Sequence, residues 1–173
     1  VSSLRIENYA AQETEADVAW AREVLTSDLP WIEYYPSLPN AEVLELLKGA
    51  DVGLLPTWAD TYGLSILEAQ GCACPVISTD IRALPEMNDN LCGWLIRVPK
   101  NKLGEALYVT PEDRALLSQT IEEGLVEIIR GIAADPQIIA VKGAAAVEKI
   151  RARHDPAKYE QTLREIYQRG LSR

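Results

Sequence analysis

The chain has 173 residues and a formal net charge of −9; 47% of its residues are hydrophobic and 25% are charged. These fractions are typical of a globular protein of one domain, so they exclude a disordered or collagen-like chain. The acidic balance argues against a nucleic-acid-binding or membrane-surface domain, because phosphate backbones and anionic lipids attract basic faces.

Two further features narrow the class of protein. No apolar run approaches the roughly 18 residues that a membrane span needs, and three cysteines, an odd number, do not make a disulfide framework. We therefore expect a protein of the reducing cytoplasm with no membrane span. The first residue is Val1 rather than Met, so we expect the sequence to be a piece of something longer.

Strand and helix signals alternate through the first hundred residues. Short runs rich in apolar, β-branched or aromatic residues predict strands at 4–6, 31–35, 51–55, 75–78 and 93–96. Helical patterns lie between several of them, at 13–25, 41–48 and 62–70, and Asn40 is expected to cap the second helix. Strands separated by helices predict βαβ units, and therefore an α/β domain whose parallel sheet is covered on both faces.

Beyond Pro99 the pattern is helical. We predict one loop and three helices, with the loop at 101–110 and the helices at 111–134, 138–153 and 156–169. The first of these helices carries an apolar stripe made of Leu117, Ile121, Leu125, Ile128 and Ile129. We expect one domain over 1–173, with an α/β core over 1–98 and a loop with C-terminal helices over 99–173.

The most informative segment is 56–69, which follows the predicted strand 51–55. Ligands of open parallel sheets bind beyond the carboxyl ends of the strands, where loops lead into helices. The helix that begins in this segment has few charges and is expected to be buried, yet Glu68 lies near its end and Asp60 just before its start. A helix N-terminus that contains Gly63 is suited to binding a diphosphate.

Glu68 is expected to have a specific partner, because burying an unpaired carboxylate is costly. Helical spacing would place Thr61, Ser65 and Glu68 on one polar stripe. A simpler interpretation stays open, in which Asp60 is only an N-cap residue and Glu68 pairs with an arginine or reaches solvent.

Other possible sites are weaker. The cysteines lack zinc-ligand spacing and are expected to be small buried thiols, and the only histidine, His154, is expected at the surface. Neither phosphate-loop motif, G-x-x-x-x-G-K-[ST] or G-x-G-x-x-G, is present. Three tryptophans are expected to pack in the core or at its rim, namely Trp20, Trp31 and Trp94.

Residues 60–69, D-T-Y-G-L-S-I-L-E-A, resemble the E-x7-E signature (E-G-F-G-L-x-x-L-E-A) of the group 1 family of retaining glycosyltransferases, which have the GT-B fold. Further matches follow in the same order, at 75–80 (P-V-I-S-T-D), 84–87 (L-P-E-M) and 93–96 (G-W-L-I), with another upstream at 31–55. The resemblance covers about residues 3–98. It implies a Rossmann-like domain, the C-terminal, donor-binding half of a GT-B fold.

The resemblance also implies roles for individual residues. Asp60 would contact hydroxyls of the donor sugar, Glu68 would bind the ribose hydroxyls, and backbone amides near the helix start would meet the diphosphate. The residues implied in donor binding beside Glu68 are Tyr62, Gly63, Leu64 and Ser65. Further possible contributors are Trp58, on which a sugar ring could stack, and Thr61, Arg82 and Glu86.

The sequence departs from the family pattern in two respects. The first acid is Asp60, one methylene shorter than glutamate, and Arg82 and Ala83 replace a pair of glycines, so we expect a differently shaped loop there. The family's cationic residues and its N-terminal, acceptor-binding domain would lie upstream of Leu4. We therefore expect this chain alone to be inactive.

The resemblance implies transfer of a sugar from a nucleotide-diphosphate sugar to a hydroxyl acceptor, without a metal ion or other cofactor. The expected partners are the nucleotide sugar and an acceptor-binding domain of the same or another chain. Three alternatives stay open: a non-catalytic module that binds a nucleotide sugar or a protein, one chain of a split transferase, and a nucleotide-sugar epimerase or hydrolase of the same fold.

Overall fold

Three short parallel strands form the sheet of the computed structural model, which describes residues 10 and 12–171. They are β1 (Gly53–Leu55), β2 (Val76–Thr79) and β3 (Gly93–Ile96), and they lie side by side in chain order. Gly53 pairs with Val76, and Val76 pairs with Gly93. The carboxyl ends of the strands therefore lie at one edge of the sheet and their amino ends at the other.

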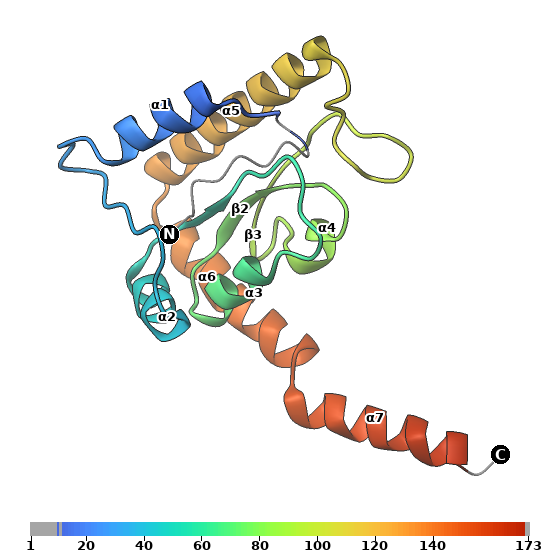
Figure 1. Ribbon diagram of the computed structural model, residues 1–173. Helices are drawn as coiled ribbons and strands as arrows, with labels where there is room; N and C mark the ends of the chain where they lie inside the picture. Colours follow the sequence, from blue (N-terminus) through green and yellow to red (C-terminus); the bar gives the residue numbers. More distant parts are fainter. Residues whose placement is uncertain (1–9, 11, 172–173) are drawn as a thin grey trace.

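Helices connect and cover these strands (Figure 1). Helix α3 (Leu64–Gly71) joins β1 to β2 and packs against both, and the short helix α4 (Leu84–Met87) lies between β2 and β3. All four residues of β2 are buried. Because successive side chains of a strand point to opposite faces, the central strand is covered on both faces. The predicted α/β, Rossmann-like architecture is confirmed.

The segment between the first two helices differs from its prediction. Helices α1 (Glu15–Leu25) and α2 (Asn40–Gly49) form where expected, but 31–35 contains no strand. Pro30 and Pro36 bracket that segment, and Trp31 is 75% exposed. Aromatic residues favour a strand where they fit the pleated surface of a sheet, and no strand of the described residues pairs with this segment. The predicted strand at 4–6 lies outside the described residues.

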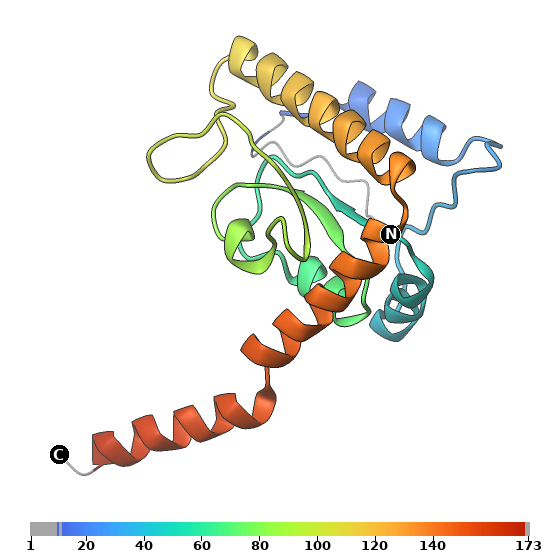
Figure 2. The ribbon, with the colours of Figure 1, turned by 180° about the vertical axis from the view of Figure 1, so that it is seen from behind.

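The C-terminal part consists of three helices, as predicted. Helix α5 (Pro111–Ala134) and helix α6 (Gln137–Arg153) both pack against β3, whereas α7 (Pro156–Leu171) extends away from the body (Figures 1 and 2). Leu117 and Ile121 of the predicted stripe are buried, but Ile129 is about half exposed. Leu125 and Ile128 pack against the core as well, so the stripe was predicted too wide only at Ile129, which lies off the face that packs against the core. None of the described helices is long and apolar enough to cross a lipid bilayer.

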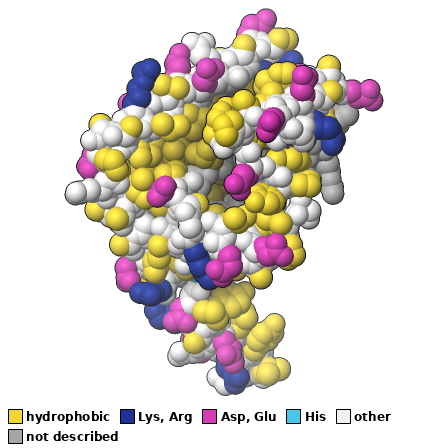
Figure 3. All heavy atoms as spheres, turned by 90° about the vertical axis from the view of Figure 1, so that its left-hand side faces the viewer, with side chains coloured by type: hydrophobic (Ala, Val, Ile, Leu, Met, Phe, Trp, Pro, Cys, Tyr) yellow, Lys and Arg dark blue, Asp and Glu magenta, His cyan; other side chains and the backbone are white. Residues whose placement is uncertain are grey.

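Hydrophobic side chains remain on the surface around α1 and α2. Figure 3 shows them gathered on this face, around a hollow. Trp20 and Trp31 are 68% and 75% exposed, so the prediction that they pack in the core is wrong. Trp94, by contrast, packs against the core as predicted.

The cysteines and the histidine largely follow their predictions. Cys74 and Cys92 are buried and Cys72 is half-buried, and all three are free thiols. Burial raises the pKa of the Cys74 thiol to about 11, so it stays protonated and unreactive. His154 is exposed at the end of α6.

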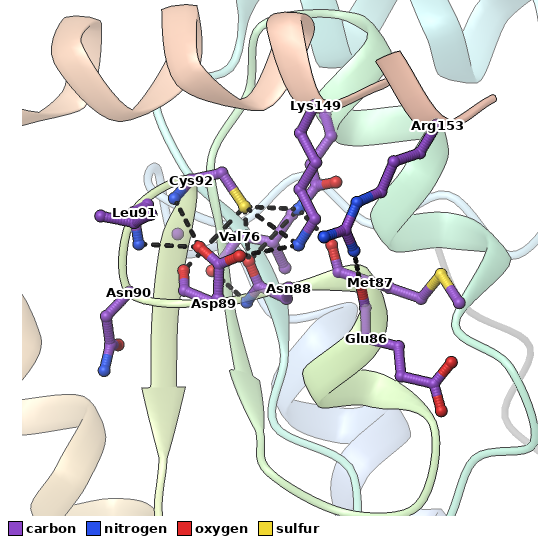
Figure 4. A network of polar contacts seen from close by, with 12 residues as sticks. Val76, Glu86, Met87, Asn88, Asp89, Asn90, Leu91, Cys92, Lys149 and Arg153 are labelled. Atoms are coloured by element: carbon purple, nitrogen blue, oxygen red, sulfur yellow. Dashed lines mark hydrogen bonds and ion pairs between the residues drawn. The ribbon is translucent and has the colours of Figure 1, made fainter. Parts of the chain in front are cut away.

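A polar network that the sequence did not reveal occupies the amino edge of the sheet (Figure 4). The Asn88 side-chain amide donates to the carbonyls of Val76 and Trp94 and to the Ser78 hydroxyl, at 2.9 to 3.1 Å. Buried Gln70 at the end of α3 donates to the Met87 carbonyl at 3.1 Å. These bonds join α3, the loop after α4 and the strands β2 and β3.

Two lysines of α6 complete the network. Lys142 is buried; its ammonium donates to the carbonyls of Asn90 and Gly93 and lies 5.0 Å from the centre of the Trp94 ring. Lys149 lies 2.9 Å from the Asp89 carboxylate, and Figure 4 shows the two side chains pointing toward each other. Helix α6 is thereby attached to the amino edge by charged hydrogen bonds as well as by packing.

Candidate functional site

The opposite, carboxyl edge carries the residues that the motif singled out. The loop after β1 holds Asp60, and the turn after β2 holds Arg82. Ala59, Asp60, Thr61 and Arg82 line one hollow of about 330 Å³. Side chains separated by about twenty residues in sequence therefore meet at one place, because parallel strands end at the same edge.

Asp60 is bound to its own loop. Its Oδ1 accepts hydrogen bonds from the backbone N–H groups of Tyr62, at 2.9 Å, and Gly63, at 2.7 Å. Gly63, not Asp60, is the N-cap residue of α3. Its φ of +79° and the 2.7 Å that would separate an added Cβ from Leu84 Cδ2 explain why glycine stands there.

The helix therefore begins later than the sequence indicated. Because α3 starts at Leu64, Thr61 lies in the loop, and the predicted stripe of Thr61, Ser65 and Glu68 is wrong in its first member. The amides of Tyr62 and Gly63, both near the predicted helix start, are bound by Asp60. The N–H groups of Leu64 and Ser65 lie in the first helical turn, where no intrahelical carbonyl can accept them.

Arg82 is held from two directions. Its guanidinium lies 2.6 Å from Glu105 Oε1, and its backbone N–H donates to the Gly104 carbonyl at 2.8 Å. The Asn101 amide and the Arg82 guanidinium hold the pKa of Glu105 below its ordinary value. Arg82 has a φ of +43°, so this position keeps a conformation that normally favours glycine, despite carrying a side chain.

Glu68 lies in a second hollow, of about 290 Å³, between α2, β1 and α3. Ser65 lines the same hollow, with apolar residues such as Val43 and Leu55. The partner of Glu68 is the Asn40 amide, whose Nδ2 donates to Oε1 at 2.7 Å. The expected specific partner is thus present, but it is a neutral amide of α2 rather than an arginine.

The remaining predicted residues are more scattered. Tyr62 and Leu64 are exposed beside the two hollows, and Trp58 packs against the core. Glu86 is exposed on α4, where its carbonyl accepts a 3.4 Å hydrogen bond from Arg153. The described linings of the two hollows include neither Trp58 nor Glu86.

Two residues near the site escaped the sequence analysis. Glu105 carries no motif signal, and its contact with Arg82 spans 23 residues. The prediction that Asn40 caps α2 is wrong, because Pro39 is the N-cap residue and Asn40 is the first helical residue. Its position before a helix was the one available signal, and it pointed to a different role.

Comparisons with known proteins place the chain among enzymes that transfer sugars. Residues 11–123 match the family model of the "Glycosyl transferases group 1". The chain is 32% identical over 73 residues to O-antigen chain mannosyltransferase B of Escherichia coli, a match covering 42% of this chain and 19% of that protein.

Two other relatives match the chain over longer segments. The chain is 25% identical over 153 residues to the alpha-maltose-1-phosphate synthase of Mycolicibacterium smegmatis, covering 88% of this chain and 32% of that protein. It is 30% identical over 95 residues to a D-inositol 3-phosphate glycosyltransferase of Saccharomonospora viridis, covering 52% and 22%. The matched region thus spans a third or less of each of these relatives.

Proposed function

The chain belongs to the group 1 glycosyltransferases, and from this premise we propose that residues 1–173 form the donor-binding domain of a retaining enzyme. That enzyme moves a sugar from a nucleotide-diphosphate sugar to a hydroxyl acceptor. The bond from the anomeric carbon to the diphosphate breaks with its electron pair on the leaving diphosphate, a bond to the acceptor oxygen forms, and the proton of that hydroxyl passes to the diphosphate. The observation that carries the proposal is the meeting of Asp60, the start of α3 and Arg82 at the carboxyl edge, with Glu68 one helical turn further along α3.

Each residue has a role suited to its chemistry. Glu68 accepts hydrogen bonds from both hydroxyls of the ribose, because a carboxylate is an acceptor with about four lone-pair sites. The diphosphate lies at the start of α3, where the N–H groups of Leu64 and Ser65 and the helix dipole favour negative charge. Asp60 faces the sugar, beside Arg82.

The same proposal covers the partners. The leaving diphosphate must be stabilised electrostatically as the bond breaks, without a metal ion or cofactor, and we assign part of that to the α3 dipole. The acceptor binds to a further domain, of this or another chain, and closure between the domains excludes water. The chain alone then binds donor without turnover, in the cytoplasm, where nucleotide sugars are the donor substrates.

The test is donor binding to the chain, measured by isothermal titration with UDP-, GDP- and ADP-glucose. We expect one of these ligands to bind saturably and Glu68→Gln to weaken it by about 10- to 100-fold, since a charged hydrogen bond contributes about 1.5–3 kcal/mol. Glu127→Gln, an exposed substitution on α5, is the matched control and should leave affinity unchanged. Absence of saturable binding, or a Glu68→Gln variant with full affinity, would contradict the proposal.

One observation favours a second candidate, a non-catalytic module that binds a nucleotide sugar. Asp60 is a short acid whose Oδ1 is already bound to two amides of its own loop. In that case Asp60→Asn would leave donor affinity intact and turnover by the assembled protein would be undetectable. If Asp60 acts on the sugar, Asp60→Asn lowers turnover more than affinity.

A further inference from the structure

The Asn40 side-chain amide binds Glu68 of α3 rather than a group of its own helix, α2. The N-terminus of α2 has no side-chain cap, whereas α1 and α5 each begin with a complete capping box, at Thr14 and Thr110. Pro39 is the N-cap residue of α2 and has no polar side chain, and Asn40, the first helical residue, donates its side-chain amide to Glu68 of α3.

The bond itself is short and charged. Asn40 Nδ2 lies 2.7 Å from Glu68 Oε1, across 28 residues of sequence, and links the first turn of α2 to the middle of α3. An amide orients a carboxylate without neutralising it. A lysine or arginine in its place would pair with the charge and compete with the ligand. The bond uses one acceptor site of Oε1 and leaves the other oxygen available.

From these contacts we infer that Asn40 is a positioning residue, which holds the Glu68 carboxylate in the orientation that receives the two hydroxyls of a ribose. The inference rests on the proposed function, since it assigns to Asn40 the selection of ribose at that same site. Asn40 itself need not touch the nucleotide. Its effect passes through Glu68 and is greatest for ligands that carry both ribose hydroxyls.

The experiment compares two ligands that differ only in those hydroxyls. The probes are the nucleoside diphosphate that the chain binds most tightly, among UDP, GDP and ADP, and its 2′,3′-dideoxy analogue. The readout is the dissociation constant of the dideoxy analogue divided by that of the nucleoside diphosphate. The urea midpoint of unfolding is measured beside this ratio. A merely structural role would change the midpoint or both constants in parallel, and the ratio would stay constant.

Four variants make the test specific. Asn40→Asp has the shape of asparagine without the N–H donor, and Asn40→Ala removes the side chain; each should lower the ratio by about three- to tenfold, the value of one hydrogen bond. Asn40→Gln keeps the amide and should restore part of the ratio. Glu42→Ala changes the same turn of α2, keeps the Asn40 amide, and should leave the ratio as in the wild type.

The outcomes separate the two proposals. A wild-type chain that binds none of the probes, or that binds ribose and dideoxyribose forms equally, contradicts the proposed function and the inference with it. A wild-type chain that discriminates, with Asn40→Asp and Asn40→Ala discriminating equally well, overturns the inference alone. Because Asn40 is exposed, its variants are expected to fold with an unchanged urea midpoint.

Discussion

The polar groups at the two edges of the small sheet differ in how far other groups of the protein bind them. At the amino edge, the Asn88 side-chain amide donates hydrogen bonds to three acceptors, and the carboxylate of Asp89 and the ammonium of Lys142 are bound to groups of the protein. At the carboxyl edge, Asp60 and Arg82 line one hollow, and Glu68, one helical turn further along α3, lines a second hollow and has one amide partner among the described residues. Polar groups that are bound to other groups of the protein hold elements together, whereas acceptors left available to solvent can bind a ligand.

The difference follows from the cost of leaving buried polar groups unpaired. A buried polar network stabilises the fold when its members have partners, and at the amino edge Gln70 Oε1 is the one buried side-chain atom of the described network that has none. A carboxylate that binds a ligand must keep free acceptor sites. For Glu68 the free-energy cost of these unpaired sites is small, because the residue is half-exposed and water can reach it. Substitutions at the amino edge should therefore change stability, and those at the carboxyl edge should change binding.

The largest expected effect comes from Gly93→Ala. An added Cβ would lie 2.2 Å from Asn88 Oδ1 and 2.4 Å from the backbone carbonyl of Val76, so the network or the strand must shift. We expect a loss of about 3 kcal/mol in the free energy of unfolding, measured in urea. The matched control is Gly131→Ala in α5, where nothing lies within 4 Å and a gain of up to about 1 kcal/mol is expected. Equal effects of the two substitutions would refute the view of the amino edge as a tightly packed network.

A smaller effect is expected from Asp89→Asn, and it should depend on pH. Although partial burial opposes ionisation, the Lys149 ammonium and the N–H groups of Leu91 and Cys92 lower the pKa of Asp89 to about 2. A depressed pKa stabilises the fold above the unfolded value near 4, and this stabilisation is lost as the pH falls toward 2. The carboxylate is 38% exposed, so water screens the pair and we expect only about 1 kcal/mol.

The measurement for Asp89 is urea unfolding of the wild type and Asp89→Asn at several pH values between 7 and 2. The gap between the two proteins should be constant above about pH 5 and should shrink steadily below it. A gap that is independent of pH would show that the charge of Asp89 does not contribute to the network.

The sequence predicted local features well and distant contacts poorly. The strands at 75–78 and 93–96 and the C-terminal helices follow from apolar runs, Pro111 and the Asp135-Pro136 break, all of which act within a few residues. The false strand at 31–35 shows the limit of such patterns, because a strand needs a neighbour that the pattern does not contain. The bonds from Lys142 and Lys149 to the amino edge span 49 to 60 residues, and composition carries no sign of them.

The candidate site likewise combines local features that the sequence predicted with contacts that it did not. The motif at 60–69 singled out the two acids, whose roles stay predictions, but the helix predicted over 62–70 begins two residues later, at Leu64. What spacing did not show is that Asp60 binds the Tyr62 and Gly63 amides, since that depends on the left-handed turn at Gly63. The Asn40–Glu68 bond is equally invisible, because it depends on how α2 packs against α3.

The most direct test of the difference between the two edges of the sheet is an amide NMR titration of the chain with the nucleoside diphosphate that it binds most tightly. The account predicts saturable shifts at the start of α3, around Leu64, Ser65 and Glu68, and at Asn40, with little change at Asn88–Cys92. Saturable shifts centred on the amino edge, or no saturable shifts at either edge, would contradict it.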